Sequence, residues 1–153
     1  MKTLPLNKID RFKGEYEFLS NFSYSPFIYK NVYYPTVEHF FQANKTTNEK
    51  IRNEIAAVPT PSQAKYRGRA VQLRSDWRKI RTNVMEIGLR EKFNQNPDLK
   101  QKLLDTGDAY LEEGNHWHDN TWGNCNCMGC KDKEGKNYLG QLLMKLREEY
   151  KNA

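Results

Sequence analysis

The chain has 153 residues, of which 37% are hydrophobic and 29% are charged, and its formal net charge is +6. This length and balance predict one well-solvated domain with a core of its own. No apolar run approaches the roughly 20 residues that span a bilayer, so a membrane-spanning protein is excluded and no membrane partner is expected. The first ten residues, MKTLPLNKID, lack the apolar segment of a secretion signal, and we therefore expect a cytoplasmic location.

The positive charge favours anionic partners, such as phosphorylated metabolites, nucleotides or nucleic acid. Lysines and arginines alternate with acidic residues, however, which is typical of ordinary solubility charge. This alternation argues against a dedicated nucleic-acid patch. Nothing in the pattern indicates an oligomeric state.

The first part of the chain predicts short strands followed by a helix. Residues 1–12 are expected to form a loosely structured lead-in. Residues 27–30 and 32–34 are β-branched and aromatic runs, which predict a hairpin or a pair of extended pieces. Thr36 is a suitable N-cap for a helix over residues 37–45.

Helices account for most of the remaining chain, and the fold class expected is α+β, a helix-rich single compact domain. Prolines 59, 61 and 97 are expected helix boundaries, Gly68 a break, and Ser75 the cap of the longest helix. The predicted helices cover residues 49–58, 62–69, 75–96, 98–104 and 137–150. Residues 110–112 predict a brief strand, and residues 113–136 a long loop of the kind that is more often functional than idle.

The stretch YPTVEHFFQA places a carboxylate, Glu38, inside an otherwise largely apolar run. On a helix, Glu38, Gln42 and Lys45 share a narrow arc, because their spacings are i, i+4 and i+7. This stripe could be an ordinary solvated face in which Glu38 favours the helix dipole. It could also present a carboxylate to a pocket. Periodicity by itself favours the solvated face.

The predicted loop contains NHWHDNTWG, residues 115–123, with two histidines, an aspartate and two tryptophans. Such a loop could line a pocket that stacks a planar ring. Alternatively, its tryptophans could pin the loop to the core while Asp119 makes a local turn bond. Trp77 likewise could serve a site, although its pattern favours a core anchor at the start of its helix.

Three cysteines follow with the spacing C-x-C-x-x-C, at positions 125, 127 and 130. With His116 or His118 they could form a tetrahedral zinc site. Because the spacing supplies only three sulfurs, we expect a reduced, metal-free loop and no cofactor. The sequence also lacks a P-loop, a G-x-G-x-x-G fingerprint and a G-x-S-x-G elbow, which leaves hydrolysis by carboxylates open.

Five segments in order resemble the NADAR (YbiA-like) domain family: FLSNFSYSPF, YPTVEHFFQANK, YRGRAVQLRSDW, HDNTWG and GKNYLGQLLMKLR. The domain that carries the resemblance spans residues 13–150. It implies a compact, helix-rich α+β fold of the YbiA-like type and N-glycosidase chemistry on ribose-bearing nucleotides. Members of the family are tied to phosphoribosylamino-pyrimidine intermediates of riboflavin synthesis, and others to ADP-ribose attached to a base. The cysteine cluster departs from the simpler members and leaves loop-dependent specificity open.

Carried over by position, the resemblance implies catalytic roles for Glu38, Asp119 and Trp77. The positions that it implies for substrate binding are Ser20, Asn21, Lys45, Arg69 and Trp122. Cleavage of a ribosyl C–N bond passes through an oxocarbenium-like transition state, which a carboxylate beside the anomeric carbon stabilises. We expect Glu38 to orient the attacking water and Asp119 to serve the sugar or the leaving group, with no metal required.

Three functions follow from these features. The first is an N-glycosidase that hydrolyses the ribosyl C–N bond of a phosphoribosylated pyrimidine, a small-molecule substrate. The second applies the same chemistry to an ADP-ribosylated base such as guanine in nucleic acid. The third is a non-catalytic, zinc-stabilised module that binds nucleic acid, supported by the cysteines and the charge.

Overall fold

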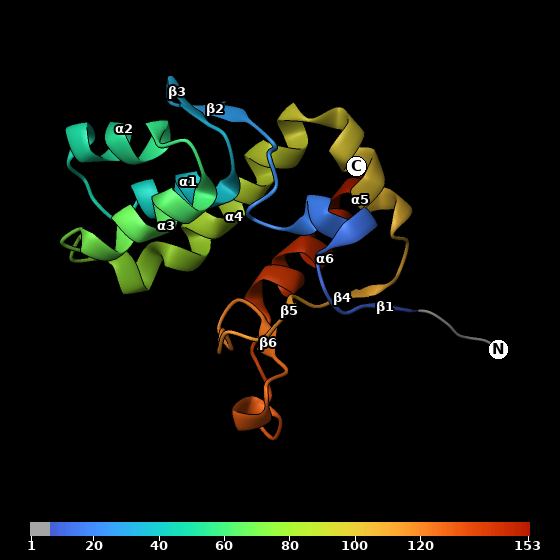
Figure 1. The fold of residues 1–153 in the computed structure, drawn as a ribbon. Helices are drawn as coiled ribbons and strands as arrows, with labels where there is room; N and C mark the ends of the chain where they lie inside the picture. The colour runs from blue at the N-terminus through green and yellow to red at the C-terminus, as the bar shows by residue number, and fades with distance from the viewer. Residues whose placement is uncertain (1–6) are drawn as a thin grey trace. The chain divides into compact units, whose positions relative to one another are not determined.

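The computed structural model describes residues 7–153, which form two compact units (Figure 1). One unit consists of residues 21–97, and the other combines residues 7–20 with residues 98–153. Helices dominate and the strands are short, so the expected helix-rich α+β class is confirmed. Within the described residues no helix is both long and apolar enough to cross a membrane.

The unit of residues 21–97 contains one hairpin and four helices. Its elements are β2 (Phe27–Tyr29), β3 (Val32–Tyr34), α1 (Val37–Ala43), α2 (Glu49–Ala57), α3 (Pro61–Ala70) and α4 (Trp77–Gln95). The predicted hairpin is confirmed, with Ile28 opposite Tyr33 in an antiparallel pair. Lys30 and Asn31 form the turn with positive φ values of 49° and 68°, the combination typical of tight hairpin turns.

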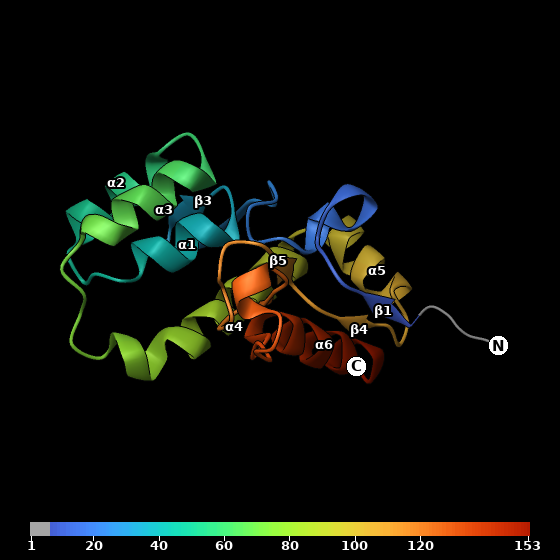
Figure 2. The same ribbon diagram turned by 60° about the horizontal axis from the view of Figure 1, so that its bottom comes forward.

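Helix α1 is the centre of this unit, and all seven of its residues are buried. It contacts α2, α3 and α4, which surround it in Figures 1 and 2. Thr36 caps it as predicted, since its hydroxyl accepts the N–H of His39. Phe40 packs edge-on against Tyr29 and Tyr34, with ring centroids 5.3 and 5.0 Å apart. Burial on every side means that the solvated-face interpretation of this helix is wrong.

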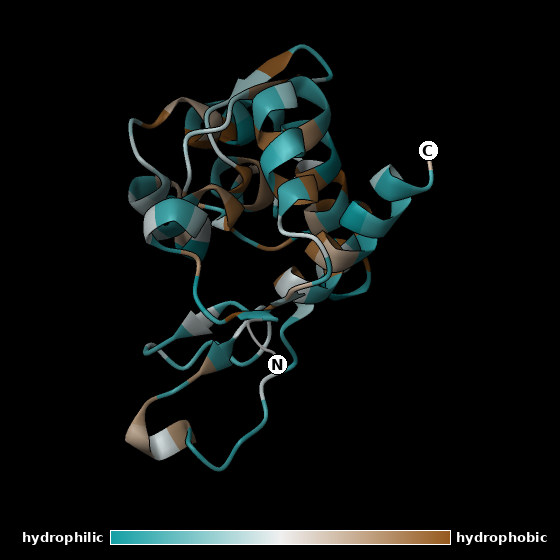
Figure 3. Ribbon diagram, turned by 90° about the vertical axis from the view of Figure 1, so that its right-hand side faces the viewer, coloured by the Kyte–Doolittle hydropathy of each residue, from teal (hydrophilic) through white to brown (hydrophobic). Residues whose placement is uncertain are grey.

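The other unit is built around the C-terminal helix. Its elements are β1 (Lys8–Ile9), η1 (Gly14–Leu19), α5 (Pro97–Asp105), β4 (Tyr110–Leu111), β5 (Gly114–Asn115), β6 (Asn124–Cys125), η2 (Met128–Cys130) and α6 (Tyr138–Lys151). Strands β1 and β4 pair in parallel, as do β5 and β6. Leu139, Leu143 and Leu146 are buried along one stripe of α6, and the helices in Figure 3 accordingly carry both hydrophobic and hydrophilic segments.

Several predicted boundaries are wrong for identifiable reasons. Pro61 begins α3 rather than ending α2, because Thr60 and Gln63 form a reciprocal capping box around it. Gly68 lies inside α3 without breaking it. Asp76, not Ser75, precedes α4. Lys8 and Ile9 form a strand in the expected lead-in, whose residues 1–6 lie outside the described part of the chain.

Asn137 fixes the end of the long loop to the start of α6. Its backbone is left-handed, with φ 52°. Its side chain accepts the N–H of Glu113 at 3.0 Å and donates to the carbonyl of Leu111 at 2.9 Å. Gly140, in the first turn of α6, lets this helix approach the carbonyl of Leu111. A Cβ at residue 140 would collide with that oxygen. The long loop therefore begins and ends at the same hydrogen-bonded junction, where Asn137 contacts Leu111 and Glu113.

His39 is fully buried beside the N-terminus of α1 with both ring nitrogens hydrogen-bonded. The Thr36 hydroxyl lies 2.8 Å from Nδ1, and Nε2 lies 2.9 Å from the carbonyl of Val58. These partners suit the neutral ring with its proton on Nε2. Burial lowers the pKa of His39, and the hydrogen bond to Val58 only partly opposes that shift.

We expect the free energy of unfolding to decrease as the pH falls below about 6.5, the ordinary pKa of histidine. The reason is that the unfolded chain then binds a proton which buried His39 accepts only at lower pH. His39→Gln keeps an N–H donor and does not titrate, so its pH dependence should be weaker. Denaturant titrations from about pH 5.5 to 7.5 measure this slope.

The matched control is His116→Gln, at an exposed histidine of the long loop, which should retain the parent's slope. A His39→Gln variant with the parent's pH dependence would contradict the prediction.

Candidate active site

The carboxylate of Glu38 lies in the interior of the 21–97 unit, with 7% of the residue exposed. Gln42, one turn along α1, donates from Nε2 to Oε2 of Glu38 at 2.7 Å. The backbone N–H of Glu38 donates to the carbonyl of Asn21 at 3.1 Å. A buried carboxylate is costly unless it is hydrogen-bonded or paired with a cation. These bonds hold Glu38 in one position on a rigid helix.

Two amide side chains close to Glu38 each bury an oxygen that has no hydrogen-bond partner, Oε1 of Gln42 and Oδ1 of Asn21. Asn21 uses its Nδ2 for a 3.4 Å contact with the sulfur of Met85. Gln42 fits because residue 68 is glycine: a Cβ there would collide with Oε1. Orphaned buried acceptors each cost about 1–3 kcal/mol and are candidates for ligand or water contacts.

Lys45 brings positive charge to the turn that follows α1, which ends at Ala43 rather than at the predicted residue 45. Burial lowers its pKa; the carboxylate of Glu38 opposes that shift, while the cations Arg69 and Lys65 add to it. The Nζ of Lys45 lies 5.9 Å from the ring centroid of Phe41. Helix α3 thus adds two cations to Lys45 and Glu38, an arrangement that suits an anionic ligand. Lys65 was not predicted, although its i, i+4 spacing from Arg69 is a readable signal.

Trp77 is buried at the first position of α4, with 6% of the residue exposed. Its ring meets Phe41 edge-on at 4.9 Å between centroids. The backbone N–H of Trp77 donates to the carbonyl of Arg74. The backbone N–H of Arg74 in turn donates to the carbonyl of Lys45. The core-anchor interpretation therefore describes its contacts. Those contacts also link it to the aromatic ring and the loop next to Lys45.

The remaining predicted residues belong to the other unit. Ser20 is the C-cap of η1 and its N–H donates to the carbonyl of Glu17 at 2.9 Å. Oδ1 of Asp119 accepts the N–H groups of Thr121 and Trp122 at 3.1 and 2.8 Å. The local turn bond offered as the alternative role of Asp119 is thus present. The ring of Trp122 packs 6.1 Å from that of Tyr138.

Of the loop's two tryptophans, Trp117 is 51% exposed and does not pin the loop to a core. His118, rather than His116, joins the cysteines: its ring and the sulfurs of Cys125, Cys127 and Cys130 offer ligand atoms within 4.8 Å of one another. The sequence left the choice of histidine open.

A cavity of about 970 Å³ also lies in the 21–97 unit, and the sequence did not indicate it. The hairpin, α2 and α4 line it together with Phe40 of α1 and Asn44, the residue that follows this helix, whereas Glu38 and Lys45 do not. We place the candidate site at Glu38 because a buried carboxylate that interacts with Lys45, which Arg69 and Lys65 also influence, offers chemistry that volume alone does not.

Comparison with known proteins finds an N-glycosidase and a riboflavin biosynthesis protein among the relatives of this chain. The chain is 41% identical to N-glycosidase YbiA of Escherichia coli (strain K12) over 137 residues, which cover 88% of this chain and 82% of the relative. It is 37% identical over 134 residues to a riboflavin biosynthesis protein of Vibrio vulnificus (strain YJ016), covering 86% of this chain and 35% of that one.

The fold has a solved counterpart in the NMR structure of the E. coli protein YbiA. The two agree with a TM-score of 0.81 at 38% identity, over 95% of this chain and 86% of the other. A family description, the NADAR domain, matches residues 10–151 and so includes both units. The resemblance carried by the five sequence segments is therefore confirmed, and the chain belongs to the NADAR domain family.

Proposed function

We propose that this protein is an N-glycosidase that hydrolyses the ribosyl C–N bond of a phosphoribosylated, pyrimidine-like base. The observation that carries the proposal is the buried Glu38 carboxylate, which influences the charge of Lys45 within a cluster of cations. The N-glycosidase relatives supply the reaction type. The relative named for riboflavin biosynthesis points to the phosphoribosylamino-pyrimidine class of substrate.

Glu38 stabilises the positive charge that develops on the ribose as the C–N bond breaks, and it orients the attacking water. Gln42 holds the carboxylate through its 2.7 Å hydrogen bond. Preorganisation of this kind is effective because the donor does not have to reorient during the reaction. The side-chain oxygen of Asn21 has no hydrogen-bond partner and is available to a ribose hydroxyl or to the water. The backbone carbonyl of Asn21 is already used, since it accepts the N–H of Glu38 at the start of α1.

The cations bind the phosphate. Lys45 and Lys65 supply ammonium groups, and Arg69 supplies a planar guanidinium that can make two parallel bonds to phosphate oxygens. Burial lowers the pKa of Lys45, and repulsion from Arg69 and Lys65 adds to that shift. A bound dianion relieves that repulsion. The site therefore favours phosphorylated ribosides over the corresponding nucleosides.

Trp77 acts on the site through Phe41, the ring it contacts. We assign Trp77 a positioning role, because it packs against Phe41, the ring beside Lys45. Direct stacking of Trp77 on the base stays a prediction made from the family resemblance. The roles of Ser20, Asp119 and Trp122 are likewise predictions. For Asp119 the predicted role is to serve the sugar or the leaving group.

An ADP-ribosylated base in nucleic acid is the second candidate substrate. It is favoured by the exposed position of Arg69 next to the site and by the net charge of +6, since a pyrophosphate needs more cations than a single phosphate. Incubation with phosphoribosylamino-pyrimidines and with ADP-ribosylated DNA, followed by chromatography of the released base, separates the two. Release from the DNA alone would overturn the first choice.

The substitution Glu38→Gln keeps the volume and the hydrogen bonding of the side chain but removes its charge. We expect kcat to fall about 100- to 10,000-fold, the usual contribution of an acid–base group, with an unchanged melting temperature. Glu49→Gln is the control, because Glu49 is an exposed first-turn glutamate that lines the 970 Å³ cavity instead. If the control loses activity and Glu38→Gln does not, the reaction belongs to that cavity.

The substitution Arg69→Ala should raise KM for the phosphorylated substrate about 10- to 100-fold, the loss expected for one charged hydrogen-bonding group. The KM for the substrate without its phosphate should not change. Arg67→Ala is matched to it, since Arg67 is on the same helix but pairs with Glu54 at 3.1 Å. Equal KM changes with both substrates would show that Arg69 does not bind the phosphate.

Two variants separate the turn made by Asp119 from a chemical role. Asp119→Asn retains an oxygen that accepts the N–H groups of Thr121 and Trp122, so its melting temperature should match the parent's. Asp119→Ala loses both bonds and should be less stable by about 1 kcal/mol or more. We expect kcat to fall at least about 100-fold in both. Full activity in Asp119→Asn would leave this residue only its turn.

A further inference from the structure

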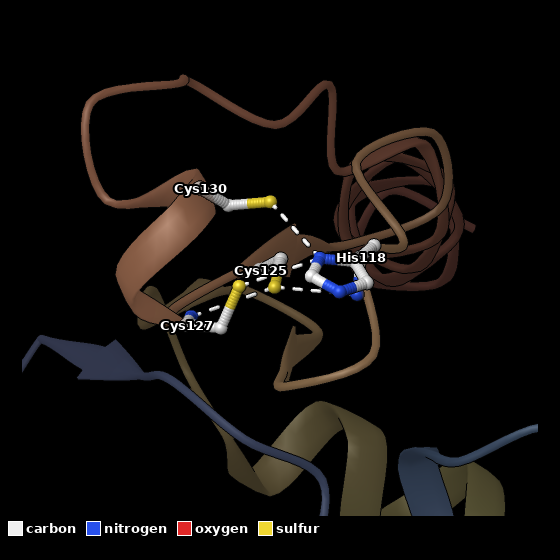
Figure 4. A group of neighbouring side chains, drawn as sticks. All are labelled: His118, Cys125, Cys127 and Cys130. Atoms are coloured by element: carbon white, nitrogen blue, oxygen red, sulfur yellow. Dashed lines mark hydrogen bonds between the residues drawn. The ribbon is translucent and has the colours of Figure 1, made fainter.

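Four metal-binding side chains converge in the long loop, and neither the proposed reaction nor the comparisons give them a role. They are His118, Cys125, Cys127 and Cys130, drawn in Figure 4. Nδ1 of His118 lies 3.4 Å from the sulfur of Cys130 and 3.3 Å from that of Cys127. All four ligand atoms lie within 4.8 Å of one another.

These distances fit a single tetrahedral ion. Zinc with Zn–S bonds of about 2.3 Å and a Zn–N bond of about 2.1 Å separates neighbouring ligand atoms by about 3.6–3.8 Å. A disulfide would require one pair of sulfurs in covalent contact, and all three cysteines are free. An iron–sulfur cluster with two irons would hold its ligand pairs on opposite sides of the cluster rather than around one point.

The backbone around the cluster is arranged to accept charged sulfur. The N–H groups of His118 and Cys127 point to the sulfur of Cys125, at 3.3 and 3.5 Å. The N–H of Cys130 donates to the carbonyl of Cys127 at 3.0 Å, which closes the C-x-x-C turn. Backbone donors to a sulfur are the outer-sphere contacts that fix and tune a metal-bound thiolate.

His118 is held in a sparsely populated backbone conformation, with φ at +68°. A residue other than glycine reaches this region at some cost, which the surroundings must offset. Here the unusual backbone turns the imidazole toward the cysteines (Figure 4). His116, two residues earlier, is not part of the group.

The loop has little apolar packing to hold it together. Between Leu111 and Leu139, all of which is described, the buried hydrophobic side chains are those of Cys125 and Cys130. The regular structure there consists of two-residue strands and one 3-10 turn. A segment of this size without an apolar core gains stability from a cross-link, and a metal held by four ligands supplies one.

From these observations we infer that His118, Cys125, Cys127 and Cys130 form a structural zinc site that orders the loop carrying Asp119 and Trp122. Three thiolates and an imidazole select zinc over oxygen-seeking cations such as calcium or magnesium. Four protein ligands fill the tetrahedron and leave no position for water or substrate, so the site is structural rather than catalytic. The metal-free loop favoured by the sequence pattern is thereby revised.

The test is the metal content of the full chain, purified without chelators and measured by plasma mass spectrometry. We expect about one zinc per chain, and below about 0.1 in Cys127→Ser. Exchange for Co²⁺ should give the intense visible bands of a tetrahedral site and the near-ultraviolet bands of thiolate ligation. These readouts do not depend on glycosidase activity.

The two histidines provide the matched pair. His118→Ala should weaken zinc binding at least about 100-fold, the upper end of what changes in a zinc ligand's surroundings cost. His116→Ala should bind zinc as the parent does. Because these losses are read at the metal, they remain interpretable when loop order also changes. Hydrogen exchange of residues 113–136 should rise on chelation in the parent and be high without chelator in Cys127→Ser.

Three outcomes overturn the inference. Protein that contains no zinc and gives no tetrahedral Co²⁺ spectrum would show that the cluster does not bind a metal. Iron with acid-labile sulfide would replace zinc by a cluster. One titratable thiol per denatured, unreduced chain, instead of three, would show a disulfide.

Discussion

The hydrogen bond from Gln42 to Glu38 is the interaction on which the candidate site depends, because it fixes a carboxylate inside a helix that has no exposed residue. A carboxylate in such surroundings is expensive to ionise without compensation. The compensation comes from the Gln42 amide and from the electrostatic influence of Lys45. If α1 were exposed to water, solvent screening would weaken both interactions.

The packing of α3 on α1 brings the cations of α3 within electrostatic reach of Lys45. Gly68 permits the approach, since a side chain there would occupy the position of the Gln42 amide. The next residue is Arg69, and Lys65 lies one turn earlier on the same helix. One close helix contact therefore determines both how Glu38 is held and which cations influence Lys45. Family membership gives the chain its reaction, N-glycoside hydrolysis, and the proposal made above locates that reaction at Glu38.

The loop of the other unit is organised by polar contacts instead of an apolar core. Asp119 caps the turn that leads to Trp122, and Asn137 joins the end of the loop to β4. His118 stands next to Asp119 and belongs to the group of metal ligands. A zinc ion held there would restrict the backbone of the HDNTWG segment directly. In that case the cysteines would reinforce the segment that carries Asp119 and Trp122.

The sequence by itself determined the fold class, the hairpin, the Thr36 cap and the leucine stripe of α6, because these depend on local patterns of polarity and on turn and capping residues. It also singled out Glu38 as a candidate catalytic residue, through motifs that resemble a family. It could not determine that α1 is buried on all sides, since burial depends on which other helices cover a face. The capping box that makes Pro61 a helix start was likewise missed, because Pro59 and Pro61 were both interpreted as the end of the preceding helix. Only the tertiary structure selected His118 over His116 and placed Lys65 with Lys45, because ligands and charges meet through chain folding that sequence spacing does not encode.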